Sequence, residues 1–215
     1  MSVFVEVWGD YGCFSRPELK VERVSYDVIT PSAARGILDA IFWHPGMRWI
    51  VDRIYVLSPI RFANIRRNEC KSKISCAKVR TVMNCGKGDL CLYTSEDIQQ
   101  RAAMVLQDVH YVIEAHFEMS SHAAPSDNPG KFQDMMKRRL DKGQCFHQPC
   151  FGTREFPARF RRWPGKTVPT IHEDRDLGLM LYDMDYSDRS DIRPMFFRAK
   201  MVGGVVDVAN CEVVR

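Results

Sequence analysis

Hydrophobic and polar residues alternate over several short stretches of the chain, which is the spacing of a half-buried β-strand. The clearest case is residues 109–119, where apolar side chains occupy every second position from Val109 onward. The positions between them are mostly polar and include His110, Glu114 and His116. This alternation predicts a strand with one face in the core and a second, polar face.

Further strands are predicted where β-branched and aromatic residues cluster between turn residues. The ranges are 3–8, 49–57, 60–65 and 103–106, followed toward the C-terminus by 177–184, 195–201 and 205–213. We expect the first strand to end at Gly9-Asp10, and we expect 103–106 to be a separate strand adjacent to 109–119.

Apolar residues at three- and four-residue intervals from Ala34 to Phe42 predict a helix. Thr30-Pro31 supplies its N-cap and a proline suited to the first turn, and His44-Pro45-Gly46 should follow its end. A second, short helix is expected over 131–140, with basic residues toward its C-terminal end and Gly143 just after it.

Two segments show neither the two-residue spacing of a strand nor the three- to four-residue spacing of a helix. We expect residues 11–29 to be an irregular excursion, and residues 66–95 to be a long basic loop or insertion, with or without a short hairpin. The order of elements then predicts an α+β fold: a ferredoxin-like (RRM-like) N-terminal domain at 1–143 with a basic insertion, and a small C-terminal antiparallel β subdomain at 144–215. That fold hosts many functions and does not choose among them.

The composition is that of a packed globular protein, because 45% of the 215 residues are hydrophobic and 11% are aromatic. No stretch of 18 uncharged apolar residues exists, which argues against a membrane span. The segment Met1–Glu6 lacks the basic start of a secretory signal. We therefore expect a cytoplasmic protein.

The net charge of +4 is an average over an uneven distribution. Residues 61–87 and 131–166 each carry a net charge of +7, whereas 88–130 carries −6. Two basic blocks can bind a polyanion if they fold onto one surface. The alternative is that they are solvated loops and a charged helix face.

No cofactor or metal is expected from the motifs. The chain has no Walker loop, G-x-G-x-x-G, H-E-x-x-H or G-x-S-x-G sequence. None of its eight cysteines forms a C-x-x-C pair, and Cys145-Phe146-His147 with Cys150 lacks a second half, so we expect reduced thiols. Asp183-Met184-Asp185 resembles a metal-binding pair, but we expect a solvated acidic loop there.

Residues 151–163 interleave arginine with phenylalanine and tryptophan behind Gly152, a pattern that suits nucleic acid. Guanidinium groups bind phosphates, aromatic faces stack on unpaired bases, and glycine lets a backbone approach the ligand. Alternatively, the aromatic residues are core and the arginines are solvated. The candidate RNA-binding residues are Gly152, Arg154, Arg159, Arg161, Arg162 and Trp163, together with Arg35, Lys78 and Arg80.

His116 is the first catalytic candidate, since it lies on the polar face of a predicted strand. A histidine can act as general base or acid on a ribose 2′-hydroxyl or a leaving 5′-oxygen. RNA supplies its own nucleophile, so a metal-free site needs only proton transfer and cationic stabilisation of the phosphorane. The alternative is a hydrogen-bonded structural histidine. His44, after the first helix, is a second candidate.

Several segments together resemble one protein family. They are FVEVWGDY from Phe4, SYDVITPSAARGI from Ser25, AIFWHP from Ala40, DVHYVIEAHF from Asp108 and CFGTREF from Cys150. The chain resembles, over most of its length and in the same order, the Cas5d family of subtype I-C CRISPR–Cas systems, within the RAMP superfamily.

The resemblance implies a ferredoxin-like domain followed by a C-terminal β subdomain. It also implies a ribonuclease that cuts precursor CRISPR RNA at the 3′ base of the repeat hairpin without a metal. The protein would then stay on the 5′ handle of the crRNA, with the other subunits of the subtype I-C surveillance complex as partners.

The family's catalytic set is implied to comprise a tyrosine, a lysine and a histidine. His116 matches the histidine, Phe42 stands at the place of the tyrosine, and Ala115 and Glu114 beside His116 provide no lysine. Tyr26, Tyr111, His44 or a lysine of the 66–90 segment would have to fill those roles. Two other functions are therefore kept open: a non-catalytic RNA-binding subunit, and a non-specific double-stranded DNA-binding protein.

Overall fold

The protein is described by a computed structural model that covers residues 2–19, 21–165, 167–188 and 190–214. Over these residues the chain forms three helices, α1 (Pro31–Ile41), α2 (Cys76–Cys85) and α3 (Pro129–Lys142). Over the same residues it forms ten strands, which are β1 (Val3–Gly12), β2 (Arg23–Val24), β3 (Met47–Val56), β4 (Phe62–Cys70), β5 (Ile98–Met119), β6 (Arg159–Arg162), β7 (Arg175–Asp185), β8 (Arg193–Val202), β9 (Val205–Asp207) and β10 (Val213–Val214).

The ten described strands belong to one sheet. Its main path runs β10-β8-β9-β3-β5-β1-β6, and β2 and β4 also pair with β5, while β7 pairs with β8. The pairings are antiparallel except for the short one between β2 and β5. This confirms the predicted combination of helices with a large antiparallel sheet.

β5 is one continuous strand at the centre of the sheet. Its residues 98–106 pair with β4, and its remaining part pairs with β1 and β3. The prediction of two separate strands at 103–106 and 109–119 is therefore wrong. Asp108 lies at the predicted break with a φ of 53°, and aspartate tolerates this left-handed conformation better than most residues do. The strand consequently continues through it.

Both predicted helices are confirmed, with their caps. The Thr30 hydroxyl accepts a hydrogen bond from the Ala33 backbone N–H at 3.2 Å, and Pro31 begins α1. Asn128 caps α3 in the same way, and Gly143 ends it with a φ of 62°. A glycine at this position adopts the left-handed conformation without steric cost.

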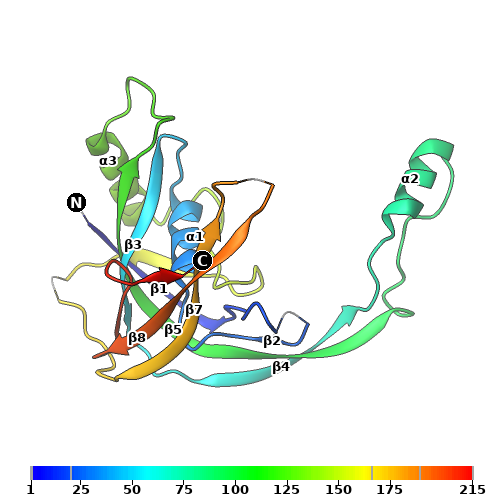
Figure 1. Ribbon diagram of the computed structural model, residues 1–215, viewed down its shortest axis with the longest axis horizontal. Coiled ribbons are helices and arrows are strands. Elements are labelled where there is room, and N and C mark those ends of the chain that lie inside the picture. The colour runs from blue at the N-terminus through cyan, green and yellow to red at the C-terminus, as the bar shows by residue number, and fades with distance from the viewer. Residues whose placement is uncertain (1, 20, 166, 189, 215) are drawn as a thin grey trace.

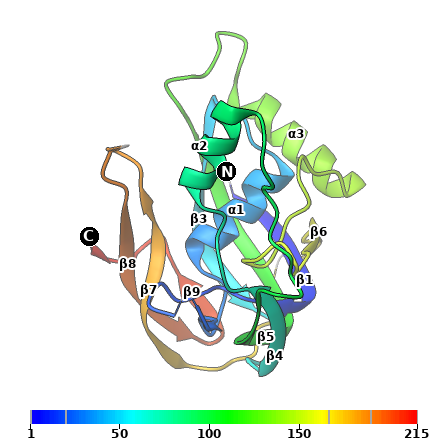
Figure 2. The same ribbon diagram turned by 90° about the vertical axis from the view of Figure 1, so that its right-hand side faces the viewer.

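α1 and α3 cover one face of the sheet with an aromatic cluster. The Phe132 ring of α3 lies 6.0 Å from the ring of Phe42 and 6.1 Å from that of Phe117 in β5. The Trp49 indole N–H donates to the Phe42 carbonyl at 2.8 Å, which joins β3 to the end of α1. In Figure 2 the β7–β8 hairpin lies to the left, α3 to the right, and α1 between them.

β4, α2 and the first part of β5 form an arm that reaches away from the rest of the molecule (Figure 1). Residues 66–95 are thus not the predicted loop: they include the end of β4 and the helix α2. Ser75 caps this helix and Gly86 ends it with a φ of 64°. The sequence pattern did not predict α2, because this helix buries none of its residues and therefore has no apolar stripe.

Three smaller predictions also need correction. β1 continues past Gly9-Asp10 to Gly12, because residues of β5 pair with it up to that point. Asp183-Met184-Asp185 lies in β7 rather than in a solvated loop. The predicted strand 205–213 is two short strands, β9 and β10. Among the described residues, no helix has the length and apolar character that a bilayer crossing requires.

Candidate functional site

His116 and Asp52 form a hydrogen-bonded pair. The Nδ1 atom of His116 lies 2.8 and 2.9 Å from the two carboxylate oxygens of Asp52. The side chain of His116 is 34% exposed and that of Asp52 is 17% exposed. The imidazole is therefore held firmly at Nδ1 and remains accessible to a ligand from solvent.

The position of His116 follows from the alternation along β5. Phe117 packs against Trp49 and Phe132 on the helix-covered face, so His116 projects from the opposite face. We call that side the polar face. Residues paired directly across neighbouring strands share a face, so the pairings identify its other members. Its residues are His110, Glu114 and His116 of β5, Phe4, Glu6 and Trp8 of β1, Arg53 and Tyr55 of β3, and Arg159 and Arg161 of β6.

A tyrosine–carboxylate pair stands next to His116 on the polar face. The Tyr55 hydroxyl donates to Glu114 at 2.7 Å, and the Arg53 guanidinium lies 3.5 Å from the same carboxylate. Burial raises the pKa of Tyr55, and its hydrogen bond to Glu114 raises that pKa further. Tyr55 is therefore a neutral hydroxyl near neutral pH.

A third network connects β1, β5 and β6. The carboxylate of Glu6, only 3% exposed, lies 2.8 Å from Nε2 of His110 and forms an ion pair with Arg161. The Arg161 guanidinium also lies 5.4 Å from the ring centroid of Trp8, a distance at which a cation is attracted to the ring face. This network stabilises the edge of the polar face.

Replacing Glu6 with glutamine is expected to make folding less sensitive to acid. Although burial raises the pKa of Glu6, the hydrogen bonds and charges of Arg161 and His110 lower it below its ordinary value of 4.5. The stabilisation from Glu6 is therefore complete above its unfolded pKa and is lost as the pH falls through its folded pKa. Urea unfolding at about pH 7 and about pH 3 should show a larger loss for the wild type than for the variant. Equal losses would contradict this role.

Comparison with known proteins decides the family. The family model described as CRISPR-associated protein (Cas_Cas5) matches residues 2–209. The chain belongs to the Cas5d family. A CRISPR pre-crRNA endoribonuclease Cas5d from Mannheimia succiniciproducens is 54% identical over 212 residues, covering 95% of this chain and 93% of the relative. One of the same name from Thermus thermophilus is 40% identical over 221 residues, covering 95% and 90%.

Solved structures agree with this fold. A crystal structure of a CRISPR-associated protein covers all of this chain and 97% of its own, with a TM-score of 0.71 and 22% identity. A chain of a CRISPR RNA-guided surveillance complex covers all of this chain and 89% of its own, with a TM-score of 0.52 and 11% identity. At these identities the likeness concerns the fold.

Three of the candidate residues in this Cas5d sequence are buried in the core. Phe42 is 1% exposed and packs against Phe132. Tyr26 is 2% exposed, with the Arg16 guanidinium 4.6 Å from its ring centroid, and burial raises its pKa. Tyr111 is 3% exposed, and burial raises its pKa strongly. The two tyrosines are therefore neutral hydroxyls away from the surface.

His44 does not join His116. Its Nδ1 accepts a hydrogen bond from the Gly46 backbone N–H at 3.0 Å, and its ring lies 4.8 Å from Phe132 on the helix-covered side. The carboxylate of Asp127 lies 3.8 Å from the same nitrogen. The structure thus separates the two candidate histidines onto opposite sides of the sheet.

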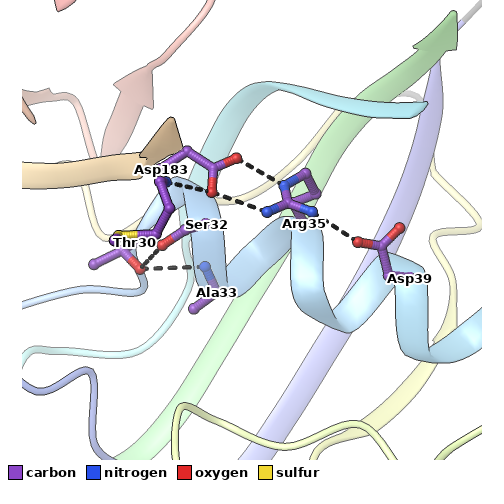
Figure 3. Close-up of polar contacts among 7 residues, drawn as sticks. Thr30, Ser32, Ala33, Arg35, Asp39 and Asp183 are labelled. Atoms are coloured by element: carbon purple, nitrogen blue, oxygen red, sulfur yellow. Dashed lines mark hydrogen bonds and ion pairs between the residues drawn. The ribbon is translucent and has the colours of Figure 1, made fainter. Parts of the chain in front are cut away.

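Arg35 is held by two acidic residues (Figure 3). Its guanidinium makes two hydrogen bonds of 2.9 Å to the carboxylate of Asp183 in β7 and one of 2.9 Å to Asp39 in α1. Asp183 is only 8% exposed. Arg35 therefore connects α1 to the C-terminal hairpin, and its charge is already neutralised.

Gly152 brings a turn close to the end of β1. Its φ is +82°, and a Cβ atom added there would lie 1.9 Å from the Cys13 carbonyl oxygen. The aromatic residues of this segment are buried: Phe151 is 0% exposed with its ring edge-to-face against Phe14, and Phe156 is 7% exposed. For these residues the core alternative applies, and glycine serves the approach of one backbone to another.

The basic residues of this segment lie at the surface. Arg154 and Arg159 are exposed, whereas Arg162 forms an ion pair of 2.7 Å with Asp141 of α3. Trp163 lines a cavity of about 300 Å³ together with Phe4. Arg159 and Arg161 thus extend the polar face at β6, and Arg162 turns toward α3.

Lys78 and Arg80 lie on α2, at the far end of the arm (Figure 1). Both are exposed. The structure therefore places the first basic block on the arm and the second on β6 and α3. Asp52, which sequence reasoning missed, carries no motif, and only the register of β3 against β5 reveals it.

Proposed function

We propose that the chain is an endoribonuclease that cleaves CRISPR repeat RNA at the base of its hairpin without a metal ion. It then stays bound to the 5′ handle of the crRNA as a subunit of the subtype I-C surveillance complex, in the cytoplasm. The observation that carries the proposal is the partly exposed, carboxylate-bound His116 in a chain 54% identical to a named pre-crRNA endoribonuclease.

His116 performs the proton transfer. Nε2 takes the proton of the ribose 2′-hydroxyl while the 2′-oxygen attacks the adjacent phosphorus. The bond from phosphorus to the 5′-oxygen breaks, and that oxygen receives a proton from the imidazolium or from water. The products are a 2′,3′-cyclic phosphate and a 5′-hydroxyl, so the step consumes no metal, cofactor or co-reactant.

The topology of the sheet supports a ferredoxin-like unit that takes three strands from residues 1–143 and its fourth strand, β6, from the segment after them. The chain order β1-α1-β3-β5-α3 is followed by β6, and the four strands lie in the spatial order β6-β1-β5-β3. This order supports a split β-α-β arrangement in our proposal, with two helices on one face and a polar face opposite. In this proposal residues 144–215 supply β6 as well as the C-terminal strands.

The RNA-binding surface follows from the exposed cations. We propose that Arg154, Arg159 and Arg161 bind the handle near β6, and that Lys78 and Arg80 bind phosphates from the arm. Arg162 and Trp163 are placed at the rim of this surface, beside α3. Arg35 is assigned to the fold, because two carboxylates bind a guanidinium that is only 28% exposed, whereas the Arg161 side chain pairs with one carboxylate and is 59% exposed. Gly152 is also assigned to the fold, because it packs against the Cys13 backbone.

Labelled repeat RNA incubated with the pure protein in excess EDTA tests the activity. Wild-type protein should cleave, and His116→Ala should cleave about 10²–10⁴-fold more slowly, since it removes the general base. The matched control is His122→Ala, because His122 is exposed in the loop after β5. Cleavage that EDTA abolishes, or that His116→Ala leaves unchanged, would overturn the proposed mechanism.

A non-catalytic RNA-binding subunit is the second candidate, and the burial of Phe42 favours it. Phe42 stands where the family resemblance places a tyrosine, and it has no hydroxyl and no exposure. This candidate predicts tight binding of repeat RNA with no product in the same assay. Affinity for any duplex DNA that falls steeply with salt would instead indicate non-specific binding through the basic blocks.

A further inference from the structure

We infer that Asp52 is a positioning residue for His116: it holds the proton on Nδ1 and thereby presents the unprotonated Nε2 to the RNA. This inference rests on the proposed ribonuclease function. It assigns a role to a residue that no sequence motif marks.

The donor and acceptor chemistry fixes the tautomer. A carboxylate can only accept hydrogen bonds, and both oxygens of Asp52 lie within 2.9 Å of Nδ1. Nδ1 must therefore carry a proton, which leaves Nε2 of a neutral ring as the acceptor. In this state the ring can take a proton from a hydroxyl, and the nearby carboxylate stabilises the imidazolium that forms.

A β-bulge aims Asp52 at the ring. Val51 pairs with Ala115 and Arg53 pairs with Glu114, so Asp52 is an extra residue in β3 between two consecutive pairs. Val51 faces the core while Arg53 faces the polar side, which leaves Asp52 free to turn toward β5. Bulges of this kind redirect a single side chain without disrupting the rest of the strand.

The C-terminal segment holds the bulge in place. The backbone N–H groups of Val208 and Ala209 both donate to the Asp52 carbonyl, at 2.9 and 3.0 Å. The adjacent pair Arg53 and Asp207 joins β3 to β9. Two hydrogen bonds to one carbonyl fix the backbone of Asp52, so its carboxylate is pre-positioned before RNA binds.

The other charged side chains near His116 either bind another residue or lie farther from His116 along the strands. On the polar face of β5 they are Glu114 and Glu118, on β3 they are Arg48 and Arg53, and on β9 it is Asp207. Glu114 is bound by Tyr55 and Arg53, and Asp207 by Asn210. Among the described residues, the carboxylate hydrogen-bonded to the His116 ring is that of Asp52.

Long-range ¹H–¹⁵N NMR of histidine-labelled protein measures the tautomer directly. In the neutral ring of wild-type His116, the spectrum should show a protonated Nδ1 and an unprotonated Nε2. In Asp52→Ala, and in Asp52→Asn, whose amide can donate to Nδ1, the populations should shift toward a protonated Nε2. Asp52→Glu should restore part of the wild-type spectrum.

Single-turnover cleavage of repeat RNA gives the second readout. Asp52→Asn and Asp52→Ala should slow the chemical step by about 10–100-fold, as loss of an orienting carboxylate does elsewhere. RNA affinity should stay within about threefold, because Asp52 does not touch the RNA in this scheme. Asp207→Asn is the matched control, since it removes a neighbouring carboxylate that does not contact the ring.

The two readouts separate the failure of this inference from that of the proposed function. An unchanged tautomer in both Asp52 variants, or an unchanged rate with His116→Ala inactive, would overturn the role of Asp52 alone. If wild-type protein fails to cleave, the ribonuclease proposal fails and the inference of a catalytic positioning role falls with it. Melting temperatures of the variants confirm that each one folds.

Discussion

Alanine at position 152 is expected to destabilise the fold severely. The new Cβ would lie 1.9 Å from the Cys13 carbonyl oxygen, and a φ of +82° is unfavourable for any residue with a Cβ. The backbone strain and the forced separation of two packed segments together cost about 2–5 kcal/mol. That is a large part of the about 5–15 kcal/mol that stabilises a typical domain. Denaturant unfolding monitored by circular dichroism measures the loss.

Gly178→Ala is the matched control for Gly152→Ala. Its φ is +69°, but a Cβ there has no atom within 4 Å, so the cost should be limited to about 1 kcal/mol of backbone strain. The comparison separates steric conflict from conformational preference. If Gly152→Ala melted like the wild type and only bound RNA more weakly, the glycine would serve the ligand and this structural role would be refuted.

Removing the charge of Arg35 is expected to be the second large effect. Arg35→Met leaves Asp183, which is 8% exposed, without the guanidinium that satisfies both of its oxygens. Because the arginine is itself 28% exposed, the loss should be about 2–3 kcal/mol, at or just below the lower limit for breaking a fully buried ion pair. Thermal or urea unfolding measures it.

Arg198→Met is the matched control for Arg35→Met. Arg198 also pairs with an aspartate, Asp176, but both side chains are largely exposed, at 72% and 50%, so no measurable change is expected. The double variant Arg35→Met, Asp183→Leu should recover part of the lost stability, since it removes both charges together. Unchanged stability of Arg35→Met with weaker RNA binding would return Arg35 to the RNA-contacting residues.

Local patterns were sufficient to predict the elements that bury a periodic face. The stripe from Ala34 to Phe42 and the alternation along 109–119 both appear in the structure, as does the polar side that carries His116. The sequence pattern did not predict α2, because this helix, capped by Ser75 and Gly86, has no buried side. A pattern based on burial cannot detect a helix that buries nothing.

The site needed information that a single segment does not hold. Asp52 reaches His116 only because an extra residue shifts the register of β3 against β5. Arg35 and Asp183 are 148 positions apart, and no local pattern pairs them. The same limit applies to Gly152, whose close neighbour Cys13 lies far away in the sequence, near the N-terminus. Long-range packing, not composition, decides whether such residues serve the fold or the ligand.

The continuity of β5 constrains where the chain can change in length. The strand has 22 residues and runs from the arm to the site without a loop between them. Losing or gaining one residue between Leu106 and His116 would put the residues on one side of the change out of register with β1 and β3, because successive side chains lie on opposite faces of the sheet. The segment 71–97 is free of this restriction, because it lies between the two strands of the arm. Insertions and deletions among relatives should therefore accumulate at the tip of the arm, while the distance from its base to His116 stays constant.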